Sequence, residues 1–109
     1  MPASDPANQD LQPLAEIDRT IHEPARLMIL ATLHVVEAAD FLFVMRQTGL
    51  TWGNLSSHMS KLEKAGYIAV EKSFVGRKPH TMLHLTGEGR AAFNSYRDKM
   101  QQVLGSVGG

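Results

Sequence analysis

The apolar residues of the chain recur at helical spacing in its first half, then at strand spacing, and at helical spacing again near its end. A first helix is predicted over residues 11–21 by apolar residues three or four positions apart: Leu11, Leu14, Ile17 and Ile21. Pro24 suits the first position of a second helix, which we expect to reach Glu37. Because most residues between 27 and 36 are apolar, this second helix is predicted to be the central buried one.

Two shorter helices with a tight turn between them are predicted next. Asp40 is a good N-cap for a third helix, Phe41–Gln47, and Gly49 breaks the helical pattern after it. Thr51 is expected to cap a fourth helix over residues 52–65. The apolar stripe of this fourth helix consists of Leu55, Met59 and Leu62.

The chain then alternates with a period of two, which predicts a β-hairpin. The first strand carries apolar residues at even offsets (Ile68, Val70 and Phe74), and the second strand returns through Thr81, Leu83 and Leu85. Residues 75–79 form the turn between them, so that the tip of the hairpin is basic. Thr86 is the expected N-cap of a last helix, whose apolar stripe is Phe93, Tyr96, Met100, Val103 and Leu104.

These elements predict a fold that is mainly α with a small β-hairpin, in the order α-α-α-α-β-β-α. A chain of 109 residues is long enough for one compact domain and too short for two. We place that domain at residues 11–104, with its terminal helices available for dimerisation. The polar residues 1–10, which include two prolines, are expected to be a disordered leader, and residues 105–109 a flexible tail.

Charge is unevenly distributed along the chain, although the net charge is zero. Residues 1–45 carry two basic and seven acidic residues, whereas residues 51–80 carry five basic and two acidic ones. The middle of the chain can therefore present a basic face, which is the electrostatic footprint of a nucleic-acid-binding surface. The absence of cysteine excludes disulfides and thiolate metal sites. No apolar run in the sequence is long enough to span a membrane.

The third and fourth predicted helices have the pattern of a helix-turn-helix, in which the second helix lies in the major groove of DNA. Off its apolar stripe the fourth helix carries small and polar residues, which allow close approach and hydrogen bonds to base edges. Trp52 is expected either to contact a sugar or thymine methyl group or to pack the helix start on the core. The predicted contacts are Thr51, Trp52, Asn54, Ser56, Ser57 and Lys61, although an ordinary solvated face has a similar composition.

Three segments of the sequence resemble the MarR/ArsR-like winged helix-turn-helix regulators. Residues 50–67 (LTWGNLSSHMSKLEKAGY) are similar to the recognition helix of that family and the turn into its wing. Glu23–Leu30 resembles the start of its second helix, and Leu85–Arg90 the motif that opens its last helix. The resemblance covers residues 14–104 and implies a homodimeric, cytoplasmic transcription factor that binds a palindromic site on double-stranded DNA. It does not imply metal sensing, because cysteine is absent, and the short terminal helices leave a small-molecule effector unknown.

In this fold the hairpin is the wing, which is expected to reach phosphates or the minor groove beside the main contact. The predicted wing contacts are Arg77, Lys78 and His80. A two-fold dimer would bury the apolar stripes of the first and last helices, because a domain of this size has a limited interior. The predicted dimer residues are Leu11, Leu14, Ile17, Phe93, Tyr96, Met100 and Val103. The alternative is that these residues close the core of a single chain.

The other chemistry-bearing residues do not form a recognisable motif. Of the five histidines, His34 and His58 are expected to be half-buried packing residues, and His80 and His84 alone do not make a metal site. No metal or cofactor is therefore predicted. Without a nucleophile–base pair, a phosphate loop or a metal motif, the sequence does not predict an enzyme. The alternative to a DNA-binding regulator is a winged-helix protein-interaction module, which the zero net charge keeps open.

Overall fold

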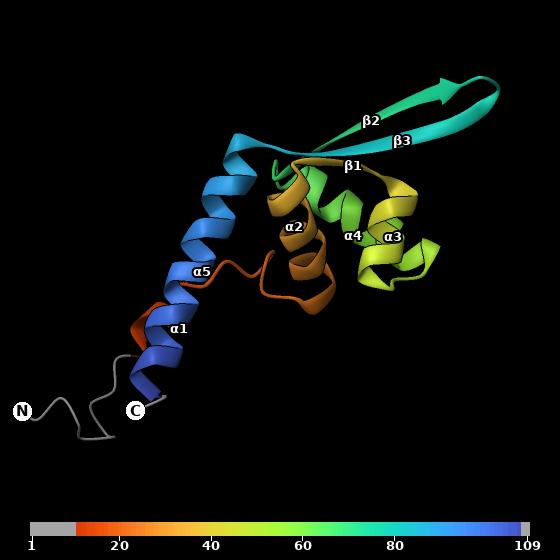
Figure 1. The fold of residues 1–109 in the computed structure, drawn as a ribbon. Coiled ribbons are helices and arrows are strands. Elements are labelled where there is room, and N and C mark those ends of the chain that lie inside the picture. Colours follow the sequence, from red (N-terminus) through yellow and green to blue (C-terminus); the bar gives the residue numbers. More distant parts are fainter. Residues whose placement is uncertain (1–10, 108–109) are drawn as a thin grey trace, which may run out of the picture.

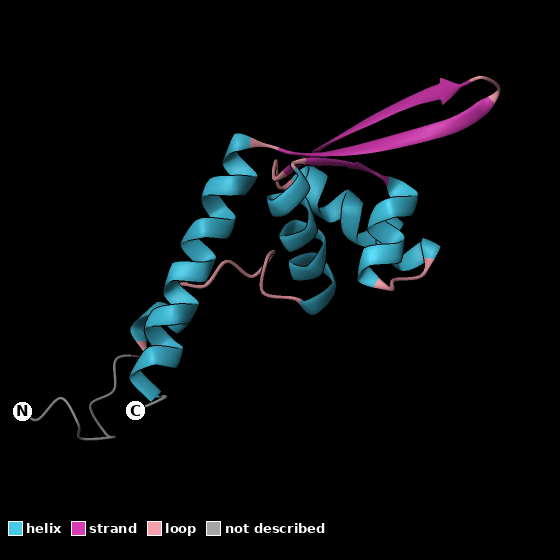
Figure 2. Cartoon of the chain, in the orientation of Figure 1, coloured by secondary structure: helices cyan, strands magenta, loops and turns pink. Residues whose placement is uncertain are grey.

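The computed structural model describes residues 11–107, which form five helices and a three-stranded antiparallel sheet (Figures 1 and 2). The helices are α1 (Gln12–Ala15), α2 (Pro24–Val36), α3 (Phe41–Thr48), α4 (Trp52–Lys64) and α5 (Gly87–Val107). The strands are β1 (Ala38–Asp40), β2 (Ile68–Val75) and β3 (Lys78–Leu85), in the sheet order β1-β3-β2. The predicted fold class is confirmed. Within residues 11–107, no helix combines the length and the apolar character needed to cross a membrane.

Side-chain caps define the turn between α3 and α4. The Asp40 carboxylate accepts a hydrogen bond from the Phe43 N–H at 2.7 Å, and the Thr51 hydroxyl accepts one from the Asn54 N–H at 3.2 Å. Both caps are those predicted from the sequence. Gly49 ends α3 with a φ of 72°, a left-handed conformation that costs glycine little because it lacks a Cβ. Local sequence therefore sets where both helices of the pair begin and how the first one ends.

The start of α5 packs against the root of the hairpin, which is the end where the chain enters β2 and leaves β3. The Thr86 hydroxyl accepts a hydrogen bond from the Gly89 N–H at 2.9 Å and donates one to the Gly66 carbonyl at 2.7 Å. Gly89 lies so close to Tyr67 that an added Cβ would stand 2.0 Å from the Tyr67 carbonyl oxygen. This packing requires glycine at position 89 and holds the long helix at a defined place beside the sheet.

The first helix is much shorter than the predicted span of residues 11–21, which is wrong beyond Ala15. The Asp18 carboxylate accepts hydrogen bonds from the N–H groups of Thr20, at 2.9 Å, and Ile21, at 3.3 Å. Such a local side-chain acceptor competes with the helical hydrogen-bond ladder and favours a turn. Ile17 and Ile21 are nevertheless buried, so their spacing marks positions that reach the core rather than a continuous helix.

The strand β1 was not predicted, and the end of α5 differs from its prediction. β1 has three residues, too few to show alternation, and pairs with β3 from Ala38↔His84 to Asp40↔Met82. α5 continues through Val107, so residues 105–107 are helical rather than part of the predicted flexible tail. The predicted leader, residues 1–10, and residues 108–109 lie outside the described part of the chain.

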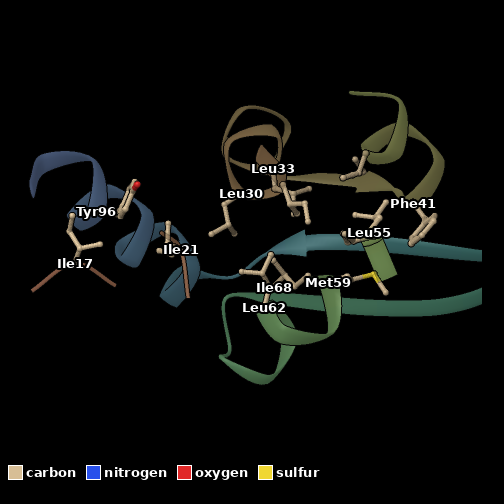
Figure 3. Packing of buried hydrophobic residues seen from close by; sticks show 14 residues of the cluster. Ile17, Ile21, Leu30, Leu33, Phe41, Leu55, Met59, Leu62, Ile68 and Tyr96 are labelled. Carbon is tan, nitrogen blue, oxygen red and sulfur yellow. The ribbon is translucent and has the colours of Figure 1, made fainter. Parts of the chain in front are cut away.

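The core surrounds α2, the helix that the sequence identifies as central. Ile29, Leu30 and Leu33 of this helix are fully buried. They form one cluster with α4, through Leu55 and Leu62, and with buried residues of the sheet. Figure 3 shows Ile17 and Tyr96 at one end of this cluster and Phe41 at the other. The core thus joins the helix pair, the hairpin root and α5 into one unit.

Candidate nucleic-acid interface

Helix α4 has one face in the core and one face that is open to solvent. Leu55, Met59 and Leu62 are buried, which confirms the predicted apolar stripe. At 3.6 residues per turn, the face opposite this stripe consists of Gly53, Ser57, Ser60 and Lys64. Of these four residues only Ser60 is partly buried. A face of small residues with a lysine at its far end is suited to close approach by another surface.

The predicted contacts of α4 lie on or beside this open face. Thr51, Asn54, Ser57 and Lys61 are exposed, and Ser56 is partly buried. The Thr51 hydroxyl oxygen caps the helix, so its hydroxyl hydrogen remains for an outside acceptor. Ser60 and Lys64, which belong to the same face, were not among the predicted contacts. Both residues could have been predicted, because the spacing of the buried stripe places them on the opposite face of the helix.

Trp52 combines the two roles that the sequence leaves open. Its ring lies 4.5 Å from the ring of Phe41, centroid to centroid, so it packs the start of α4 against α3. The side chain nevertheless remains 62% exposed. A large, exposed and well-positioned aromatic surface therefore stands at the beginning of α4, on the flank that faces the wing.

The hairpin β2–β3 forms a wing that projects away from the helices (Figure 1). The turn is shorter than the predicted residues 75–79, because strand pairing continues to Val75↔Lys78 and leaves only Gly76, with a φ of 65°, and Arg77 between the strands. Arg77 and Lys78 are exposed at the tip, as the sequence predicts. Lys72 pairs with Thr81, and Glu71 pairs with Met82. Because successive side chains of a strand point to opposite faces, Lys72 and Glu71 lie on different sides of the wing.

A hollow separates the wing from the beginning of α4. It is lined by Trp52, Ser56, Lys72 and His80, together with Phe41 and other residues of α3 and β3. The wing face that carries Lys72 therefore turns toward α4, whereas Glu71 lies on the opposite face. Lys72 was not among the predicted contacts, although strand alternation separates it from its acidic neighbour.

A second hollow lies on the other flank of α4, at its C-terminal end. Its lining residues are Arg19, Thr20, Arg26, Lys61, Lys64 and Ala65. Arg19 belongs to the connection between α1 and α2, and sequence periodicity gave no signal that it would approach α4. The open face of α4 therefore has a basic group on both of its flanks.

Arg26 is held in place by a small polar network at the start of α2. Its Nε donates to the Thr20 carbonyl at 2.5 Å, and its Nη1 lies 3.1 Å from the His58 Nδ1. The Glu23 carboxylate caps α2 by accepting from the Arg26 N–H and lies 3.6 Å from the His58 Nδ1. Partial burial of Glu23 acts to raise its pKa, but backbone hydrogen bonds and the nearby positive groups outweigh this effect and lower it. Glu23 is therefore an anion that holds this network together at neutral pH.

The predicted dimer residues divide into buried and exposed groups within a single chain. Ile17, Tyr96 and Val103 are buried, while Phe93 and Met100 pack partly buried against the core or its edge. By contrast, Leu11 and Leu14 are 48% and 44% exposed, respectively. Two further apolar residues near the end of α5 are also exposed, Leu104 and Val107. The chain thus covers part of the stripe itself and leaves an apolar strip on α1 and the distal half of α5.

Three of the histidines, His22, His34 and His58, have side-chain partners nearby. His22 Nδ1 lies 2.9 Å from the Tyr96 hydroxyl, and His34 Nε2 lies 3.1 Å from the Asn94 side-chain oxygen. His34 and His58 are half-buried, as predicted. Within residues 11–107, no three histidine or carboxylate side chains gather closely enough to hold a metal ion.

The helix pair α3–α4, its glycine turn and the basic hairpin that follows define a winged helix-turn-helix of the DNA-binding type. Residues 25–104 match the family of winged helix DNA-binding domains, and the chain belongs to this family. This finding confirms the class of regulator indicated by the sequence motifs.

Known proteins resemble this chain in sequence or in fold. An uncharacterized protein of Methanocaldococcus jannaschii is 37% identical over 82 residues, which cover 75% of this chain and 89% of that protein. A transcriptional regulator homologue from Pyrococcus horikoshii OT3 is 28% identical and superposes with a TM-score of 0.83, covering 88% of this chain and 97% of that chain. NadR, solved in complex with 4-hydroxyphenylacetate, is 18% identical and shares the fold, with a TM-score of 0.67 over 88% of this chain and 67% of its own.

Proposed function

We propose that the protein is a transcriptional regulator that binds a specific double-stranded DNA sequence as a homodimer. Helix α4 enters the major groove, and the wing contacts the adjacent backbone or minor groove. Ser57 and Asn54 read base edges, Lys61 reaches a guanine or a phosphate, and Trp52 contacts a sugar or a thymine methyl group. Arg77 and Lys78 bind phosphates and supply affinity rather than sequence preference. Such a regulator acts in the cytoplasm.

The observation that carries this proposal is the open face of α4. Small side chains occupy the middle of this face, and exposed basic residues lie on the wing and at the C-terminal end of the helix. A protein-interaction surface would be expected to present buried-type apolar anchors at its centre. The open face of α4 carries no such residue, and the exposed Trp52 lies on the flank of the helix that faces the wing. The arrangement therefore favours a polyanionic groove as the partner.

The contribution of the wing is tested by the double variant Arg77→Ala/Lys78→Ala. We expect weaker binding to every duplex and a flatter dependence of log K on log salt, by about 0.9 for each phosphate that the variant no longer neutralises. The matched control is Arg97→Ala/Lys99→Ala, which removes two charges from α5, on the other side of α2 from α4 (Figure 1). Fluorescence anisotropy at several salt concentrations measures both. An unchanged slope in the wing variant would favour the alternative of a protein-interaction module.

The homodimer is tested at the apolar strip of α1 and α5. Leu14→Glu/Leu104→Glu places two carboxylates at positions that are exposed in one chain, so the monomer fold is retained. In a dimer built on this strip the carboxylates are desolvated without partners, which opposes association. We expect sedimentation equilibrium to show a dimer for the wild type and a monomer for this variant. The control Val35→Glu, at a position 81% exposed on α2, should remain dimeric. A monomeric wild type contradicts the proposed assembly.

A further inference from the structure

We infer that the basic groove formed by Arg19, Arg26, Lys61 and Lys64 is a second clamp for the DNA backbone, on the flank of α4 away from the wing. The inference rests on the proposed function and adds to it a binding surface that extends from the end of α4 onto α2 and the α1–α2 connection. The groove joins three separate parts of the chain: the α1–α2 connection, the first turn of α2 and the last turns of α4. Its occupant is a phosphate of the duplex whose major groove receives α4.

The charge of the groove is uniform. Its lining consists of four basic residues, one threonine and one alanine, with no carboxylate among them. Arg19, Lys61 and Lys64 are exposed, and none of the three has an ion pair with an acidic residue of the described chain. Glu23 lies near Arg26 and partly balances its charge, but Arg19, Lys61 and Lys64 have no such partner within residues 11–107. Like charges that converge in this way repel each other, and a phosphate diester relieves this repulsion. The acidic residue of the same helix region, Glu63, does not line the groove.

The connection that carries Arg19 is fixed on both sides of this residue. Asp18, directly before it, accepts a hydrogen bond from the Tyr67 hydroxyl as well as from the N–H of Thr20. Thr20, directly after it, accepts the Nε hydrogen bond of Arg26. The bond to Asp18, with burial and the charges of Asp18 and Glu88, raises the pKa of Tyr67 to about 12, so the phenol remains a donor at neutral pH. Arg19 therefore projects from an anchored turn, which reduces the entropic cost of binding an anion.

The groove also lies on the side of α4 where a second backbone contact is expected, opposite the wing. Lys61 and Ser56 stand on opposite flanks of the open face, and Ser56 borders the hollow beneath the wing. A duplex seated on the open face would thus have one backbone strand beside the wing and the other beside Arg19 and Lys64. Backbone contacts on both sides of the helix fix its register in the groove.

The test compares Arg19→Ala/Lys64→Ala with the wild type and with the α5 control Arg97→Ala/Lys99→Ala, using one duplex that the wild type binds. Both altered residues of the groove are exposed, so the thermal midpoint should stay unchanged. We expect the salt slope to fall by about 0.9 for each phosphate left without its basic partner, with the base preference retained. Phosphate ethylation interference should disappear on the flank away from the wing and persist beside the wing.

The possible outcomes separate this inference from the proposed function. A wild type that binds the duplex, with a groove variant that keeps the same slope and ethylation pattern, overturns the clamp and leaves the regulator proposal in place. A wild type that retains no duplex at any salt concentration overturns both. If the groove variant instead loses ethylation interference on the wing side, the groove does not contact the backbone strand assigned to it. That result also overturns the clamp.

Discussion

Ser57→Asp is expected to abolish specific DNA binding while leaving the fold intact. Ser57 is exposed at the middle of the open face of α4, so an aspartate there meets solvent in the free protein. In the complex the carboxylate would face a groove bordered by two phosphate chains. Juxtaposed like charges cost several kcal/mol, which corresponds to an affinity loss of about 100-fold or more. Anisotropy titration of one duplex, with circular dichroism of both proteins, measures the effect.

The matched control for this variant is Ser95→Asp on α5. It makes the same substitution at an exposed helical position and changes the net charge by the same amount. We expect its affinity to stay close to that of the wild type, because long-range charge effects are screened within about 10 Å at moderate salt. Equal losses in the two variants would show that net charge, and not the face of α4, controls binding.

Gly89→Ala is expected to have the largest effect on stability. Its Cβ would lie 2.0 Å from the carbonyl oxygen of Tyr67 and 2.8 Å from the carbonyl carbon, and these backbone atoms cannot rotate away. Relief requires α5 to move off the hairpin root, which breaks the cap made by Thr86. Overpacking of this kind costs about 3 kcal/mol, or a fall in Tm of roughly 10–20 °C. Differential scanning calorimetry gives both quantities.

Gly87→Ala serves as the control for this prediction. It lies two residues earlier in the same helix, and a Cβ at that position has nothing within 4 Å. Alanine has the higher helix propensity, so the Tm should stay the same or rise slightly. A Gly89→Ala protein as stable as Gly87→Ala would mean that α5 is not packed on Tyr67 as described.

Most of the fold could be predicted from the sequence because its signals are local. Asp40 and Thr51 are short polar residues in front of apolar periodicity, and both cap the helices that they precede. Alternation identified the hairpin, and Gly49 identified the turn of the helix pair. The elements that escaped prediction depend on tertiary contacts. Residues 38–40 form the strand β1 because they pair with β3. α1 is short because the Asp18 carboxylate accepts hydrogen bonds in the turn that follows it.

The candidate site was predictable in part for the same reason. The stripe of buried residues on α4 placed Ser57 and Lys61 outside the core, and the turn composition placed Arg77 at the tip of the wing. Arg19 was not predictable, because no periodicity links the α1–α2 connection to the end of α4. Its position depends on the bond between Tyr67 and Asp18, which joins residues 49 positions apart.

The central claim, that this winged helix recognises a specific DNA sequence as a two-fold dimer, is tested most directly by selection from random duplex DNA at near-physiological salt. We expect enrichment of a palindromic site whose half-sites are about one helical turn apart, because two α4 helices related by a two-fold axis enter successive major grooves. The Ser57→Asp protein, carried through the same selection, should enrich nothing. Weak retention of all sequences by the wild type, with no site enriched, would contradict the claim.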